Sequence, residues 1–240
     1  MIPKIIHYCW FGKQPLTENV KKCIYSWKKY CPEYKVVEWN EENFDINQNI
    51  YCQEAYSVKK WAFVSDFVRL KVLYEYGGIY LDTDVEIVKN IDGLLSHRFF
   101  AGLEADDSIS TAVIGAEQNS IIIDEFLSLY DTIHFIQDND IYDYTTNVKR
   151  LSAFLKNAYG RELVKPPIVL FKGAVIYDVD FFSVKNIYDG TIKITGNTYM
   201  IHHFAGSWFN KKMKIKTILR ISIGKIFGTK IVKFIKKIIE

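Results

Sequence analysis

The sequence has no uninterrupted apolar run of about 18 residues, so we expect no transmembrane helix. At its N-terminus no basic region precedes a long apolar stretch, so we expect no signal peptide. Internal repeats and low-complexity segments are also absent. What is present is a chain of 240 residues with 49% hydrophobic content, which predicts one well-packed globular domain.

Cysteine patterns typical of metal sites or disulfide frameworks are missing too. No C-x-x-C pair occurs, and a chain of this size needs no disulfide bonds to stabilise its core. We therefore interpret the cysteines as reduced structural residues, as in a cytosolic protein; they are Cys9, Cys23, Cys31 and Cys52.

Acidic residues are almost lacking at the C-terminal end. Residues 211–240 hold ten Lys or Arg and one acidic residue, a net charge of +9. The whole chain carries +3, so the first 210 residues carry about −6. A mildly acidic body argues against a function in nucleic-acid binding for residues 1–210.

The most informative stretch of the sequence is residues 65–86, which read S-D-F-V-R-L-K-V-L-Y-E-Y-G-G-I-Y-L-D-T-D-V-E. Apolar positions recur every three and four residues up to Tyr76, which predicts a helix, and the glycine pair at 77–78 ends it. Residues 79–81 then predict a short buried strand. Asp82 and Asp84 follow at its carboxyl end, on one side because strand side chains alternate.

The two carboxylates at the carboxyl end of this strand are candidate ligands for a cation. Ligands of open α/β sheets bind outside the carboxyl ends of the strands, and two carboxylates repel unless positive charge lies between them. Asp82 and Asp84 therefore predict a Mg²⁺ or Mn²⁺ site shared with substrate phosphates, and the alternative is a polar turn. On the preceding helix Asp66 and Arg69 lie three residues apart and can pair. They form either a surface ion pair or, since apolar residues flank them, a buried pair with a function.

The N-terminal segment predicts a strand at residues 4–10, a helix capped by Thr17 and a second strand at 34–39. This order is typical of a parallel pair in a nucleotide-binding α/β half. Trp10 and Trp39 end the two strands, where an aromatic ring can stack on a base or pack in the core. Further expected elements are strands near 99–102, 111–116, 168–171, 181–182 and 192–194, helices near 120–134 and 145–159, and a loop at 138–140.

Two later segments carry candidate functional residues. In residues 199–208 an imidazole of His202 or His203 can complete a metal site, and Ser207 and Trp208 can donate hydrogen bonds to phosphate oxygens. Only one histidine is expected to reach the metal, because adjacent strand residues face opposite ways. The tail predicts a basic amphipathic helix that lies on an anionic membrane or packs on the domain. Its apolar positions are Phe227, Ile231, Phe234, Ile235 and Ile238, with Lys230, Lys233 and Lys237 off that face.

Three segments together resemble glycosyltransferase family 32, which includes bacterial capsular polysaccharide transferases and fungal Golgi mannosyltransferases. They are I-P-K-I-I-H-Y-C-W-F-G at residues 2–12, the stretch 65–86, and H-H-F-A-G-S-W at 202–208. The resemblance implies an α/β fold of GT-A type, a three-layer sandwich around a mixed, mostly parallel sheet. Residues 1–210 would form this glycosyltransferase domain and 211–240 the basic tail.

The resemblance also implies roles. Asp82 and Asp84 would hold the metal together with His203, which it slightly favours over His202. Trp10 would stack on the base, and Asp66 and Arg69 would orient the donor sugar. Ser207 and Trp208 would close over the diphosphate. Asp66, Arg69 and Asp84 would be the residues central to catalysis.

The implied reaction is a metal-dependent, retaining transfer of a hexose from a nucleotide diphosphate sugar, UDP-sugar being preferred and GDP-mannose an alternative. The acceptor would be a glycan or lipid-linked glycan in capsular or other surface polysaccharide synthesis, at the cytoplasmic face of the membrane. The alternative from another class is a non-catalytic, membrane-associated nucleotide-sugar-binding scaffold, against which the intact set of site residues argues. A sugar-1-phosphate nucleotidyltransferase would need a longer glycine-rich loop than residues 11–15 offer.

Overall fold

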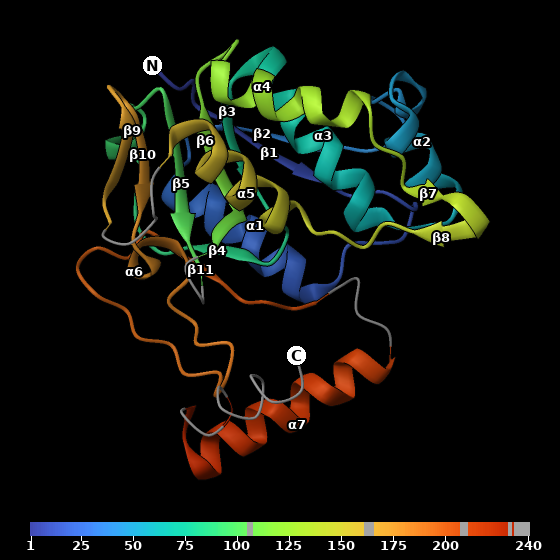
Figure 1. Cartoon of the computed structure of the whole chain (residues 1–240). Coiled ribbons are helices and arrows are strands. Elements are labelled where there is room, and N and C mark those ends of the chain that lie inside the picture. Colours follow the sequence, from blue (N-terminus) through green and yellow to red (C-terminus); the bar gives the residue numbers. More distant parts are fainter. Residues whose placement is uncertain (105–107, 161–165, 207–210, 230–231, 233–240) are drawn as a thin grey trace.

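The computed structural model describes residues 1–240 except 105–107, 161–165, 207–210, 230–231 and 233–240. Its centre is a seven-stranded sheet (Figure 1). The strands along the sheet are β2 (Lys35–Trp39), β1 (Ile5–Cys9), β3 (Gly78–Leu81), β6 (Ile109–Ala116), β5 (Phe99–Leu103), β10 (Ala174–Tyr177) and β9 (Ile168–Phe171). β6 and β9 run opposite to the other five, so the expected mixed, mostly parallel sheet is confirmed.

Helices cover both faces of this sheet. On one face lies α1 (Glu18–Tyr30), whose N-cap Thr17 accepts a hydrogen bond from the Val20 amide and whose apolar side packs with β1 and β3. The other face is covered by α2 (Ile50–Ser57), α3 (Trp61–Tyr76), α4 (Ile121–Ser128) and α5 (Asn147–Tyr159). These layers form the expected three-layer α/β sandwich around a mixed sheet.

Shorter elements fill the edges. Two strands, β4 (Val85–Ile87) and β11 (Met200–His202), form a separate antiparallel ribbon, and β7 (Ile136–Gln137) pairs with β8 (Ile141–Tyr142). Single turns of 3₁₀ helix are η1 (Ile46–Gln48), η2 (Asp92–Leu94), η4 (Leu129–Asp131) and η5 (Asp138–Asp140).

Three expected elements differ in the structure. Phe181 and Phe182 end a short helix, α6 (Val179–Phe182), because Asp178 caps it by accepting from the Val179 amide. Residues 192–194 form only a single bridge, and their isoleucines are exposed, so no buried strand forms there. The predicted helix over 120–134 ends at Ser128, where a 3₁₀ turn follows.

The last described helix is α7 (Lys211–Phe227), drawn in red at the bottom of Figure 1, beneath the body of the molecule. No helix among the described residues has both the length and the apolar character that crossing a membrane requires. Most of the tail positions on which the amphipathic prediction rests lie outside the described residues; these are Lys230, Ile231, Lys233, Phe234, Ile235, Lys237 and Ile238.

Candidate functional site

The glycine pair sets the approach to the candidate site. Gly77 and Gly78 have φ angles of 62° and 112°, a region that residues with a side chain rarely adopt. A Cβ on Gly78 would lie 2.7 Å from the Ile5 carbonyl oxygen, so only glycine lets β3 start this close to β1. The chain then runs four residues to Asp82, whose amide donates to the Ala112 carbonyl at 2.8 Å.

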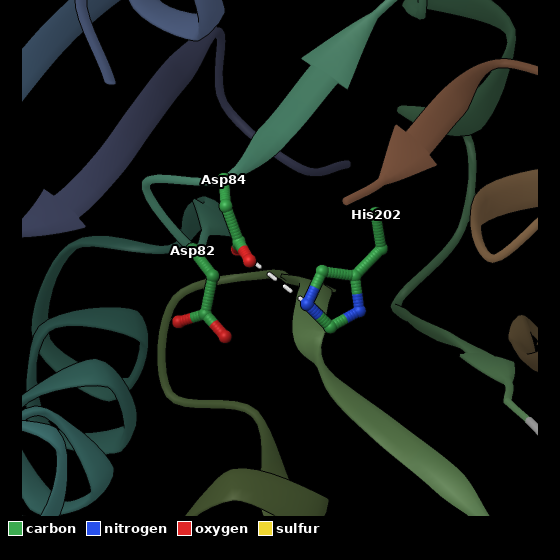
Figure 2. A group of neighbouring side chains, drawn as sticks. All are labelled: Asp82, Asp84 and His202. Carbon is green, nitrogen blue, oxygen red and sulfur yellow. Dashed lines mark ion pairs between the residues drawn. The ribbon is translucent and has the colours of Figure 1, made fainter. Parts of the chain in front are cut away.

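Three potential ligands converge at this end of β3 (Figure 2). One ligand atom each from Asp82, Asp84 and His202 lies within 4.8 Å of the others. Asp82 and Asp84 flank the β3–β4 turn, and His202 ends β11, whose register sets it opposite Val85 on β4. Two carboxylates and an imidazole are donors that suit Mn²⁺ or Mg²⁺.

The histidine that joins the aspartates is His202, and this corrects the preference for His203. His202 Nε2 lies 3.4 Å from Asp84 Oδ1. His203 instead directs Nε2 to Glu86 Oε2, at 2.9 Å, because neighbouring residues at the end of a strand point to opposite sides. The expectation that only one histidine reaches the group agrees with this geometry.

Asp84 and His202 each shift the pKa of the other in the direction that favours its charged form. Burial opposes ionisation of Asp84, but His202 and the Ala205 amide, which donates at 2.7 Å, lower the pKa of this carboxyl to about 2. Burial lowers the pKa of His202, yet Asp84 and the other nearby carboxylates outweigh it and leave that pKa raised. A cation bound here would take the place of the imidazole proton.

Asp66 and Arg69 form a buried pair, so the surface alternative is wrong. Their side chains are 11% and 5% exposed, and Arg69 Nη2 lies 3.0 Å from Asp66 Oδ1. Arg69 also donates to the carbonyls of Thr111 at 2.6 Å and Ser65 at 3.1 Å. Burial raises the pKa of Asp66 and Arg69 offsets this in part, which leaves that pKa at about 7. These three contacts hold the guanidinium in a single orientation beside Asp82.

Asp82 is oriented by two donors. Its Oδ1 accepts from the Tyr80 hydroxyl at 3.0 Å and lies 3.2 Å from Arg69 Nη1. The Arg69 guanidinium also lies over the Tyr80 ring, 4.5 Å from its centroid. Both contacts use the same carboxylate oxygen, which favours the other oxygen, Oδ2, as a metal ligand. Arg69 therefore links Asp82, and with it the group of Asp82, Asp84 and His202, to Asp66.

The two tryptophans differ. Trp39 is buried, donates to His7 Nδ1 at 3.0 Å and stacks on Tyr76, so it is a core residue. Trp10 is half-buried just beyond β1, and its indole N–H donates to the Gln14 carbonyl at 2.5 Å. Part of the Trp10 side chain is thus accessible at the edge of the sheet where the aspartates lie. The other predicted donor contacts, Ser207 and Trp208, lie outside the described residues.

Two residues near the site were not singled out from the sequence. Tyr80 could have been identified from its spacing, because it lies two residues before Asp82 and therefore points to the same side of the strand. Glu104 follows β5, within the electrostatic reach of His202 and Asp82. Burial raises the pKa of Glu104, while His202 and a hydrogen bond with Ser110 lower it. Its position depends on the β5–β6 register, which no local pattern reveals.

Comparison with known proteins agrees with the resemblance. A family model described as "Glycosyltransferase sugar-binding region containing DXD motif" matches residues 17–101, the part that holds Asp66, Arg69, Asp82 and Asp84. "Inositol phosphoceramide mannosyltransferase 3" of Schizosaccharomyces pombe is 30% identical over 126 residues, which are 48% of this chain and 33% of that protein. The chain spans about a third or less of the length of the first curated relatives that it matches.

Two solved structures share the fold. "PaToxG Glycosyltransferase" matches with a TM-score of 0.54 and 21% identity, over 66% of this chain and 70% of that one. The glycosyltransferase GlyE of Streptococcus pneumoniae matches with a TM-score of 0.51 and 10% identity, over 84% of this chain and 55% of that one. At these identities the likeness concerns the fold.

Proposed function

We propose that this chain, which belongs to the glycosyltransferase family with a DXD-containing sugar-binding region, transfers a hexose from a nucleotide diphosphate sugar to a hydroxyl of a glycan or lipid-linked glycan. The observation that carries the proposal is the group formed by Asp82, Asp84 and His202, with the Asp66–Arg69 pair directly behind it. This arrangement offers ligands for a cation and a fixed polar surface for a sugar in one place.

The metal ligands in this proposal are Asp82 through Oδ2, Asp84 and His202, for Mn²⁺ or Mg²⁺. The donor set fits such an ion, because two hard carboxylates and a borderline imidazole lie within 4.8 Å of each other. When bound, the ion would offset the negative charge that develops on the departing diphosphate. The protein contributes the orientation of these ligands, through Tyr80 and Arg69 on Asp82.

The donor would lie across the carboxyl ends of β1 and β3. Trp10 stacks on the base, and Asp66 accepts a hydrogen bond from a sugar hydroxyl while Arg69 holds that carboxylate in place. Ser207 and Trp208 would contact the diphosphate, and both lie outside the described residues. We propose retention of the anomeric configuration, with Asp66, Arg69 and Asp84 central to catalysis.

UDP-sugars are the preferred donors in this proposal, and GDP-mannose is the second candidate. The second candidate is supported by the relative from S. pombe, whose name describes a mannosyltransferase that acts on inositol phosphoceramide. For this chain we propose an acceptor in surface polysaccharide synthesis, such as a capsule. Residues 1–210 would be the transferase domain, and the basic tail 211–240 would hold it on the inner face of the cell membrane.

The proposal is tested by offering a panel of UDP- and GDP-sugars with and without Mn²⁺ and measuring release of the nucleotide. One donor should be hydrolysed in a metal-dependent manner, and Asp84→Ala should abolish this hydrolysis. His203→Ala is the matched control for His202→Ala. Only His202→Ala should lower the Mn²⁺-dependent rate of donor hydrolysis. Metal-dependent binding without turnover, even with glycan acceptors added, would favour the scaffold. No binding of any donor would refute the site.

A further inference from the structure

Helix α7 has an inner face that is fixed to the rest of the chain. A Cβ on Gly224 would lie 2.1 Å from the Tyr188 carbonyl oxygen, so the helix backbone touches this segment directly. The Arg220 guanidinium lies 5.9 Å from the centre of the Tyr188 ring. Ile221 lies on the same side, beside Gly190. These contacts set which side of α7 points outward.

The outward side is mostly apolar. Four large side chains are mostly exposed along it: Ile215 (58%), Ile218 (63%), Leu219 (56%) and Ile226 (73%). Their spacing of three, four and seven residues aligns them on one side of a helix. We call these four residues the α7 stripe. The exposed Ser222 lies on this side between Leu219 and Ile226, so the stripe is interrupted once. Four large exposed apolar side chains on one side of a helix still differ from scattered exposed residues, and they indicate an interaction surface.

Basic side chains border the α7 stripe. At 3.6 residues per turn, Lys214 and Lys225 lie along one margin and Lys216 along the other, and all three are exposed. The helix sequence holds six basic residues and no acidic one. An apolar band between lysines matches the boundary of an anionic bilayer, where acyl chains lie next to negative headgroups.

We propose that α7 lies flat on an anionic lipid surface, with the α7 stripe in the acyl boundary and Lys214, Lys216 and Lys225 at the headgroups. This deepens the membrane contact of the proposed function and assigns it to described residues of α7 rather than to residues 230–238. The helix begins at Lys211, shortly after His202, so docking holds the candidate site close to the membrane. A lipid-linked acceptor would meet the site there.

The experiment is flotation of the full chain with vesicles of phosphatidylcholine alone or mixed with phosphatidylserine. We expect binding only to the anionic vesicles, and weaker binding at higher salt. The double variant Ile218→Ser/Leu219→Ser should lower the partition coefficient about tenfold or more, because much apolar area no longer enters the bilayer. Lys214→Gln/Lys225→Gln should lower it about fivefold per lysine (about 1 kcal/mol each).

A matched control is Ile121→Ser/Ile141→Ser, which removes two isoleucines of similar exposure on α4 and β8, away from α7 in Figure 1. This control should bind like wild type. Failure of the wild type to bind anionic vesicles would overturn the proposal, as would full binding by the stripe variant. A stripe that covers a second copy of the chain would also overturn it, and is recognised when the stripe variant converts a dimer to a monomer in size-exclusion chromatography. None of these results depends on turnover, so they are separate from the test of the transferase activity.

Discussion

Replacing Tyr80 by phenylalanine removes one hydroxyl beside Asp82, a proposed metal ligand, and leaves the ring in place. That hydroxyl donates to Asp82 Oδ1 at 3.0 Å, and the ring, which Arg69 covers at 4.5 Å, is retained. A hydrogen bond to a charged group contributes about 1.5–3 kcal/mol. Arg69 still holds the same oxygen at 3.2 Å, so we take the lower end of this range.

The expected result is Mn²⁺ affinity about tenfold weaker in Tyr80→Phe, as is typical when a residue that orients a metal ligand is lost. Titration with Mn²⁺, followed through the electron paramagnetic resonance signal of the free ion, measures it directly. Tyr34→Phe is the matched control, because the Tyr34 hydroxyl donates to Asp92 Oδ1 at 2.8 Å, and Asp92 is not one of the three proposed metal ligands. Unchanged affinity in Tyr80→Phe, or an equal loss in Tyr34→Phe, would refute the reasoning.

Four further predictions concern Arg69, His202, Gly224 and Trp10. Arg69→Met should lower the free energy of unfolding by about 3–5 kcal/mol in urea titrations, because it removes the cationic partner of the buried Asp66 carboxylate; a loss below 1 kcal/mol would contradict this. The pKa of His202 is raised above 6.5, so metal-free protein should lose stability as the pH rises above 6.5 through the folded pKa, and His202→Gln should remove this dependence. Gly224→Val should speed amide hydrogen exchange in α7 alone, since its side chain would meet the backbone at residue 188; uniform exchange would speak against that contact. Trp10→Ala should weaken UDP binding by about 1–3 kcal/mol in calorimetry if the indole stacks on the base, and an unchanged Kd would exclude this role.

Local signals were strong where the prediction succeeded. Thr17 and the glycine pair at 77–78 mark element boundaries through caps and backbone conformation, so α1, α3 and β3 could be expected close to their observed positions. The burial of Asp66 and Arg69 followed from the apolar residues that flank them on α3. Each of these inferences rests on neighbours in the sequence.

Pairing between distant strands could not be predicted in this way. Alternation along β11 allows one histidine to reach the aspartates, but only the β4–β11 register decides that it is His202. The same holds for Glu104, whose surroundings depend on how β5 and β6 align. Phe181 and Phe182 suited either a strand or a helix, and the cap at Asp178 decided for the helix.

The central claim is that Asp82, Asp84 and His202 together hold a divalent cation for a nucleotide sugar. Its most direct test is an anomalous difference map from crystals grown with Mn²⁺ and a nucleoside diphosphate. We expect one dominant peak within coordination distance of all three side chains, with the diphosphate as a further ligand. A peak between His203 and Glu86, or no peak near Asp82 and Asp84, would contradict it.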